Sequence, residues 1–225
     1  MPVKFRVKDY QPGGIYHIYS RAWEGREVFR DNSDYKMFLD WIRKYLLPVQ
    51  METTVGYKAD RPYRRKRKVE MNLAESVEMW AYCLMPDHVH LLVKQNDERG
   101  IAKFMRRVMT GFVMDYNRKY RRRGMLWDGT YRAAGVGEEE VVLVTRFIHL
   151  NPVFRTVRRF GPVETVTGSA PGEYLYSSYK SYIGEEKEEW VKTEKVWELA
   201  GGVEKYRELV EKGKGDGQKH KWEID

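Results

Sequence analysis

Two histidines one residue apart have the clearest chemical potential in this sequence. His88 and His90 lie in the run CLMPDHVHLLVK, Cys83 to Lys94, directly after a Met-Pro-Asp turn. On a β-strand, residues i and i+2 project from the same face about 6.6 Å apart, so both imidazoles can approach one ion. Neutral imidazole binds Mn²⁺, Zn²⁺ and related ions, whereas Mg²⁺ prefers oxygen. The pattern therefore predicts either a divalent-metal site with a further oxygen ligand or two histidines with structural roles.

Two dense basic runs indicate a second chemistry, the binding of phosphates. RPYRRKRK spans Arg61 to Lys68 and NRKYRRRG spans Asn117 to Gly124, each with one interleaved tyrosine. Cationic side chains neutralise phosphates, and aromatic rings stack on the bases of a single strand. The residues expected to contact nucleic acid are Arg61, Arg64, Arg65, Arg67, Arg118, Tyr120, Arg121, Arg122, Arg123 and Arg132. The alternative is a solvated loop and a helix end whose cations complement the helix dipole.

The composition agrees with a protein that binds nucleic acid. The 225 residues include 41 Lys plus Arg against 33 Asp plus Glu, a net charge of +8, and 14% aromatic residues. No apolar run approaches the roughly 18 residues needed to cross a bilayer, and the first residues lack the apolar core of a signal peptide. We therefore expect a cytoplasmic, nucleoid-associated protein. The single cysteine, Cys83, cannot form an internal disulfide.

The elements that must position these residues follow from hydrophobic periodicity. Strand patterns occur at 13–23, 77–84 and 88–94, and the last two form a hairpin around the Met-Pro-Asp turn. Helical patterns occur at 30–48, after Gly100, at 138–152 and in two short segments between 193 and 213. The polar stretch from Met51 to about Leu73 is expected to be a long loop or insertion. This alternation predicts an α+β fold with helices against one face of an antiparallel sheet.

Five groups of segments share their order and spacing with one known family. They are GGIYHIYSRA with VFRDNSDYKMFL, then LMPDHVHLL, YNRKYRRRGMLWDGTYR, RFIHLNPV and YSSYKSYIG, and with the tail they extend over about residues 10 to 213. They resemble the single-tyrosine transposases of the HUH superfamily, most closely the REP-associated tyrosine transposases. The resemblance implies a ferredoxin-like or RRM-like antiparallel sheet with helices packed on it, plus a small helical C-terminal extension.

The resemblance also implies a division of the chain and a reaction. A catalytic domain would span 1–185, with a basic insertion at about 51–73, followed by a helical extension at 186–213 and a loose tail at 214–225. His88, His90 and Asn151 would hold Mg²⁺ or Mn²⁺ against a phosphodiester of hairpin-forming single-stranded DNA. A tyrosine would attack, leaving a 5′-phosphotyrosine link and a free 3′-OH. The protein would act as a monomer or homodimer.

The sequence departs from the family at the nucleophile. The family pattern is Tyr-x-x-x-Asn-Pro, whereas this chain has Phe147 four residues before Asn151, on the same helix face. We therefore expect Phe147 to face the metal site, in a transposase inactivated either by a deliberate substitution or by natural loss. A domesticated protein that binds DNA hairpins without cutting them is the alternative. Leu143, one turn earlier on the same side, leaves a core position for Phe147 open.

Other residues near the motifs have roles that the sequence leaves open. Asp87 could orient His88, bind the metal or form the turn. Tyr116 continues an apolar helical stripe and is expected in the core rather than as a substitute nucleophile. His17 is expected to be structural or a DNA contact, and His149 is given no catalytic role.

Two other functions fit parts of the pattern. An RRM-like RNA-binding protein would explain the sheet and the basic charge, but it gives no reason for the histidine pair. A zinc hydrolase using Cys83, His88 and His90 would require a cross-strand register that brings the three side chains together.

Overall fold

This computed structural model describes residues 10–47, 55–58, 61–64, 72–153 and 170–212. For 55–58 and 61–64 it describes the backbone alone. The strands are β1 (Ile15–Arg21), β2 (Val55–Lys58), β3 (Arg61–Arg64), β4 (Val77–Met85), β5 (His88–Gln95) and β6 (Arg132–Val136). The α-helices are α1 (Asn32–Leu46), α2 (Gly100–Lys119), α3 (Val141–Leu150), α4 (Tyr179–Tyr182), α5 (Glu194–Ala200) and α6 (Val203–Lys212). Short 3-10 helices are η1 (Trp23–Gly25), η2 (Glu138–Glu140) and η3 (Pro171–Glu173).

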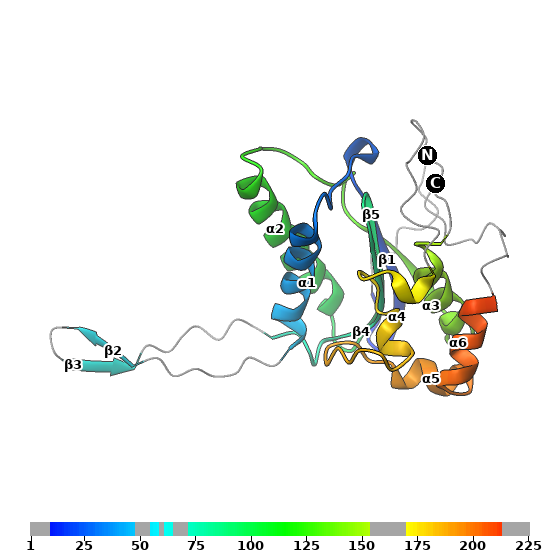
Figure 1. Ribbon diagram of the computed structural model, residues 1–225. Coiled ribbons are helices and arrows are strands. Elements are labelled where there is room, and N and C mark those ends of the chain that lie inside the picture. The colour runs from blue at the N-terminus through cyan, green and yellow to red at the C-terminus, as the bar shows by residue number, and fades with distance from the viewer. Residues whose placement is uncertain (1–9, 48–54, 59–60, 65–71, 154–169, 213–225) are drawn as a thin grey trace.

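Four strands form an antiparallel sheet in the order β4-β5-β1-β6 (Figure 1). The chain order within this unit is β1-α1-β4-β5-α2-β6, which is the ferredoxin-like βαββαβ arrangement. The predicted fold class, an α+β ferredoxin-like sheet with packed helices and a helical C-terminal extension, is confirmed. The hairpin predicted around the Met-Pro-Asp turn is β4 and β5, with Met85 directly opposite His88.

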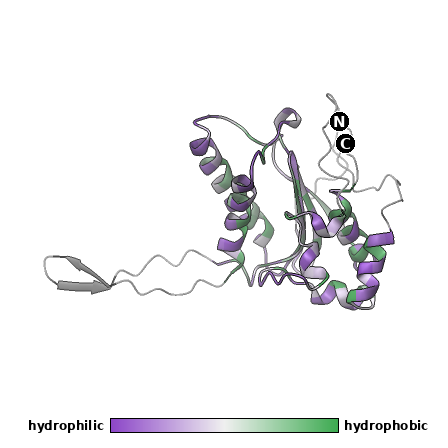
Figure 2. Ribbon diagram, viewed as in Figure 1, coloured by the Kyte–Doolittle hydropathy of each residue, from purple (hydrophilic) through white to green (hydrophobic). Residues whose placement is uncertain are grey.

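Helices cover both faces of the sheet, so the prediction of a single covered face was wrong. Helices α1 and α2 lie on one side, and α3 with α4, α5 and α6 lies on the other (Figure 1). The reason is visible in β4 and β5, which are buried along nearly their whole length rather than at alternate residues. Strands covered on both faces have near-continuous apolar sequences, because both sets of side chains must leave water. Each helix carries both hydrophobic and hydrophilic residues, because one side packs on the protein and the other faces solvent (Figure 2).

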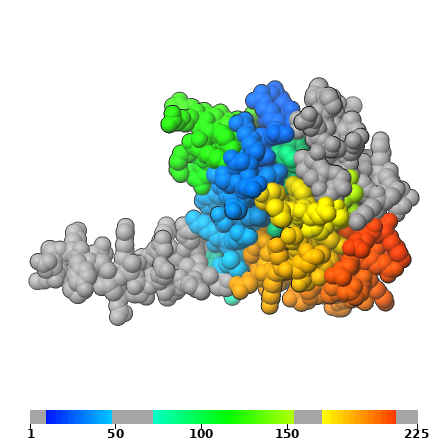
Figure 3. Space-filling view, in the orientation of Figure 1, coloured from blue at the N-terminus to red at the C-terminus, as the bar shows by residue number. Residues whose placement is uncertain are grey.

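The N-terminus of α1 is fixed by a capping box. The Asp31 side chain accepts hydrogen bonds from the amides of Ser33 and Asp34, and the Asp34 side chain accepts one from the Asp31 amide. These contacts satisfy amides that have no partner within the helix. The other side of α1 meets the segment before α4, where Tyr35 stacks on Tyr176 with ring centres 3.7 Å apart. The blue and yellow segments adjoin there in the space-filling view (Figure 3).

The stretch between α1 and β4 contains a second, two-stranded sheet. Strands β2 and β3 pair antiparallel, with Val55 opposite Arg64. Of the two alternatives for this stretch, a long loop or an insertion, these eight residues are not loop but strand. The other residues of the predicted insertion, 51–54, 59–60 and 65–71, lie outside the described part of the chain, as does the predicted tail at 214–225. No described helix is both long enough and apolar enough to span a membrane.

Candidate functional site

The strand register brings the two histidines to one face of the sheet, beneath α3. His88 is paired with Arg21 of β1, and His90 is paired with Tyr19 of β1 and with Cys83 of β4. Directly paired residues share a face, whereas Val89 and Leu91 point to the opposite face and are fully buried. The ring centres of His88 and His90 are 5.1 Å apart, with the rings nearly perpendicular.

Helix α3 places Asn151 and Phe147 against these histidines. Asn151 Oδ1 lies 3.0 Å from His88 Nε2. The Phe147 ring stands edge-to-face with His90, its centre 5.4 Å from the imidazole centre. Phe147 is only 6% exposed, whereas Leu143, one turn earlier, is 58% exposed. Phe147 therefore packs within the core and lies beside the histidines at the same time, while Leu143 belongs to the solvent-facing side.

Each histidine is held at its Nδ1 atom. Asp87 Oδ1 lies 2.7 Å from His88 Nδ1, and His17 Nε2 lies 2.9 Å from His90 Nδ1. These contacts direct His88 Nε2 to Asn151 Oδ1 and leave His90 Nε2 for a ligand, as in metal sites whose histidines are oriented by a second residue. Of the roles considered for Asp87, orientation of His88 matches this geometry. His17 is fully buried, so a DNA contact is not open to it.

Burial favours neutral imidazoles at His17 and His90. Burial lowers the pKa of His17 to about 3. Burial, followed by the charges of His17, His88 and Arg21, holds the pKa of His90 well below its usual value. His88 lies between two polar side chains, with Asp87 Oδ1 at Nδ1 and the Asn151 amide at Nε2.

The donor set fits a divalent cation. Two imidazole nitrogens and one amide oxygen suit Mn²⁺ and related ions. The 3.0 Å between His88 Nε2 and Asn151 Oδ1 also matches two neighbouring ligands of one ion, because two bonds of about 2.1 Å at a right angle end about 3.0 Å apart. Among the described residues, no group of three or more His, Cys, Asp or Glu side chains could hold a metal. The set therefore depends on Asn151, and the zinc interpretation with Cys83 gains no support.

The described basic residues that were predicted to contact DNA come from several different elements. Arg61 and Arg64 lie on β3, and Arg65 and Arg67 fall outside the described residues. Helix α2 ends at Lys119, followed by the exposed Arg121 and Arg123. The remaining two in this region have partners within the protein, since Arg118 forms an ion pair with Asp115 and Arg122 donates to the Met125 carbonyl.

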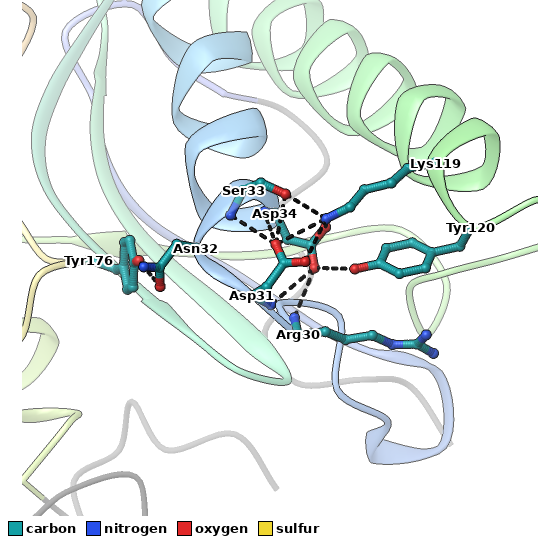
Figure 4. Close-up of polar contacts among 8 residues, drawn as sticks. All are labelled: Arg30, Asp31, Asn32, Ser33, Asp34, Lys119, Tyr120 and Tyr176. Carbon is teal, nitrogen blue, oxygen red and sulfur yellow. Dashed lines mark hydrogen bonds and ion pairs between the residues drawn. The ribbon is translucent and has the colours of Figure 1, made fainter.

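Tyr120 is already engaged within the protein, although the sequence predicted that it stacks on bases. Its hydroxyl donates to Asp34 Oδ2 at 2.8 Å, and Lys119 Nζ binds Asp34 Oδ1 at 2.7 Å (Figure 4). The Arg30 guanidinium also lies over its ring, 4.7 Å from the centre. This network ties the end of α2 to the start of α1, and Asp34 at its centre is fully buried. Base stacking on Tyr120 would have to displace Arg30 or Lys119.

The histidine face also contains two residues of β1, Tyr19 and Arg21, that the sequence reasoning missed. Tyr19 is paired with His90 on one side and with Arg132 on the other. Arg132 had been predicted as a DNA contact. The signal for them is the alternation of His17, Tyr19 and Arg21 along one strand, which places all three side chains on one face.

Comparisons with known proteins agree with this geometry. A family model described as IS200-like transposase matches residues 57–151, a range that includes both histidines, Phe147 and Asn151. This part of the chain is similar to the IS200-like transposases. The resemblance drawn from the sequence motifs is thereby confirmed. No curated protein matches the chain.

One solved structure shares the fold of this chain, and a second shows a weaker similarity. A REP-associated tyrosine transposase bound to a REP hairpin is 14% identical, covers 85% of this chain and 98% of its own, and has a TM-score of 0.53. A candidate transposase from Deinococcus radiodurans is 16% identical, covers 66% of this chain and 95% of its own, and has a TM-score of 0.37.

Proposed function

We propose that this protein contains the metal-dependent site of a transposase that acts on single-stranded DNA. In this chain, Phe147 disables the cleavage step. The observation that carries the proposal is the convergence of His88 Nε2 and Asn151 Oδ1, 3.0 Å apart, beside the Phe147 ring. These side chains come from a strand and a helix that are far apart in sequence. A purely structural histidine pair would not require an oxygen ligand and an aromatic residue at the helix end.

Each residue has a separate task in this proposal. His88, His90 and Asn151 would hold Mg²⁺ or Mn²⁺, which when bound supplies a Lewis acid for a DNA phosphodiester. Asp87 and His17 orient the two imidazoles. Phe147 occupies the position from which a tyrosine hydroxyl would attack phosphorus, forming a 5′-phosphotyrosine link and releasing a 3′-OH. Phenylalanine has no oxygen, so the unaltered chain would bind DNA without forming this link through residue 147.

The proposed DNA is a hairpin-forming single strand. The similar solved transposase was bound to a REP hairpin, and the present chain has a net charge of +8. The oligomeric form in the proposal is a monomer or homodimer, and the location is the cytoplasm, with the protein bound to the nucleoid.

The decisive experiment restores the missing hydroxyl. Phe147→Tyr protein is incubated with Mn²⁺ and hairpin-forming oligonucleotides labelled at either end, and products are separated under denaturing conditions. We expect a covalent adduct that carries the DNA 3′ to the cut, and its loss when His88 and His90 are replaced with Ala. The unaltered protein should bind the same DNA and leave it uncut.

Two controls make this experiment specific. Leu143→Tyr adds a tyrosine on the same helix at an exposed position and should form no adduct. The ring centre of Tyr19 lies 6.3 Å from that of His90, so its hydroxyl is another possible nucleophile. Tyr19→Phe removes this hydroxyl and is introduced into both the unaltered and the Phe147→Tyr chains. An adduct in the unaltered chain that disappears with Tyr19→Phe would show that Phe147 does not inactivate the protein.

The second candidate function is a hairpin-binding protein without catalysis. Phe147 favours it, because binding would survive the loss of the hydroxyl. A Phe147→Tyr protein that binds both Mn²⁺ and hairpin DNA but yields no adduct would replace the transposase proposal with this one.

Calorimetric titration with Mn²⁺ tests the metal site by itself. Unchanged affinity after replacement of both His88 and His90 with Ala would exclude them as ligands.

A further inference from the structure

The candidate metal site has two arginines beside it on the same face of the sheet. Arg21 is directly opposite His88, and Arg132 lies beyond Tyr19 in the row that contains His90. Neighbouring strands lie about 4.7–4.9 Å apart, so Arg21 is one strand spacing from His88 and Arg132 is two spacings, about 10 Å, from His90. An arginine side chain is long enough to extend over most of this distance. Both guanidinium groups can therefore reach the space next to the histidines.

Arg21 lacks the anionic partner that a partly buried cation needs. Its Nε atom is buried and has no hydrogen-bond partner, and no ion pair of Arg21 is present among the described residues. The Asp87 carboxylate, beside the histidine pair, is directed at His88 Nδ1. A buried donor without an acceptor destabilises the folded protein, and more so when the donor is charged. This cost is expected at a binding site, where the ligand provides the missing acceptor.

Arg132 shows the same lack of a partner in the described structure. Other arginines differ, since Arg118 pairs with Asp115 and Arg207 pairs with Glu204. The charge of Arg21 also reaches the metal-site histidines, because it is one of the causes that lower the pKa of His90. The two guanidinium groups lie near neutral imidazoles, so this part of the sheet face carries positive charge that an anion can neutralise.

We propose that Arg21, supported by Arg132, is the phosphate-binding residue of the candidate site and holds a phosphodiester of single-stranded DNA next to the metal position. This inference rests on the proposed function for its ligand. The planar guanidinium can donate two parallel hydrogen bonds to the non-bridging oxygens of one phosphate, which fixes its orientation as well as its position. Lysine provides charge without this fork.

The test compares Arg21→Gln, Arg21→Lys and Arg132→Gln with a matched control, Arg106→Gln. Arg106 is exposed on α2, which covers the opposite face of the sheet. Binding of a fluorescent hairpin-forming oligonucleotide is measured at several salt concentrations, together with Mn²⁺ affinity and the midpoint of thermal unfolding. For Arg21→Gln we expect DNA affinity to fall about tenfold or more and the salt slope to fall by about 1.

The other variants separate phosphate binding from a structural role. Arg21→Lys should recover the salt slope but only part of the affinity, and Arg132→Gln should show a smaller loss. Arg106→Gln should change affinity by less than about threefold. The unfolding midpoint of Arg21→Gln should not decrease, because the side chain has no partner to lose. A lower midpoint with unchanged DNA affinity would instead make Arg21 a structural residue and overturn the proposal.

The two proposals fail in different measurements. If Arg21→Gln binds DNA as well as the unaltered chain does, while replacement of His88 and His90 abolishes Mn²⁺ binding, the arginine proposal is wrong and the metal site remains. If Mn²⁺ affinity survives the histidine replacements while Arg21→Gln loses DNA, the metal proposal is wrong and the phosphate site remains.

Discussion

His149 shows how a side chain two positions from Phe147 can serve another part of the molecule. Its Nδ1 lies 2.7 Å from the Tyr206 hydroxyl and its Nε2 lies 2.8 Å from Ser178 Oγ. Burial lowers its pKa to about 3, so the imidazole is neutral and has one donor and one acceptor for these two partners. The hydrogen bonds connect α3 to α6 and to the segment before α4. His149 is therefore a structural residue, which agrees with the absence of a predicted catalytic role.

Two buried tyrosines provide a test of this connection. Tyr206→Phe removes the partner of His149 Nδ1 and should lower the free energy of unfolding by about 1–3 kcal/mol, because a buried polar atom is left unsatisfied. Tyr179→Phe is the matched control, since the Tyr179 hydroxyl is buried without a hydrogen-bond partner. That change should be neutral or stabilising in urea denaturation. Equal losses in both variants would contradict the role assigned to the His149 contacts.

Individual residues of the candidate site differ in how well the sequence predicts them. The spacing in HVH and in FIHLN is enough to place each pair on one face of a strand or helix, as the structure has them. Tyr116 is fully buried, as its helical stripe predicted. The contact of His17 with His90 could not be predicted, because it depends on which strand pairs with β5 and in what register. Arg21 was missed for the same reason.

At the scale of elements, β6 is the main omission of the sequence-based prediction. Its sequence, RAAGV, has a single β-branched residue, two alanines and a glycine, so its local β-propensity is low. It forms a strand because β1 offers an unpaired edge, with Ala134 opposite His17. The longer elements, α1, α2, β4 and β5, have strong periodic patterns or apolar runs and were predicted. Tertiary pairing, rather than propensity, determines the weakest strand of the sheet.

The packing of α1 on α2 depends on one glycine. A Cβ atom at Gly111 would lie 2.6 Å from ring atoms of Trp41, and the Trp41 indole is held by a hydrogen bond to Asp115 at 3.0 Å. We expect Gly111→Ala to lower the free energy of unfolding by about 1–3 kcal/mol in urea denaturation, since overpacking outweighs the gain in helix propensity.

A second glycine gives the control for this prediction. A Cβ at Gly135 on β6 would meet no atom within 4 Å, so Gly135→Ala should change stability by less than about 0.5 kcal/mol. A stable Gly111→Ala protein would mean that α1 and α2 can separate slightly without cost.

At the scale of the whole molecule, the net charge of +8 is the property that was visible in the sequence before any element was known. Its spatial distribution was not visible. Part of the basic surface is neutralised by partners, as at Lys119 with Asp34, whereas Arg21 and Arg132 lie beside the histidines. A count of cations therefore overestimates the number available to phosphates, because ion pairs form only once the fold brings the partners together.

The two basic runs identified in the sequence should determine the salt dependence of DNA binding. Replacing Arg64, Arg65, Arg121 and Arg122 together with Gln should reduce the slope of log affinity against log salt by about 3, from roughly 0.7 per phosphate contact on a single strand. Fluorescence anisotropy with a hairpin-forming oligonucleotide measures this slope. A control with Lys187, Lys192, Lys205 and Lys212 changed to Gln removes the same charge from the C-terminal region. Equal slopes in the two variants would show that only total charge matters.

The position of α3 between the sheet and the C-terminal helices has a thermodynamic consequence. One side of this helix carries Phe147 and Asn151, and His149 anchors it to Tyr206 of α6. Because α3 contacts both the sheet and α6, separation of α6 from α3 should also weaken the position of Asn151 Oδ1 opposite His88. Docking of the C-terminal extension and the ordering of Asn151 beside His88 are thus linked equilibria, so part of the free energy that orders these side chains originates in the contact between α3 and α6.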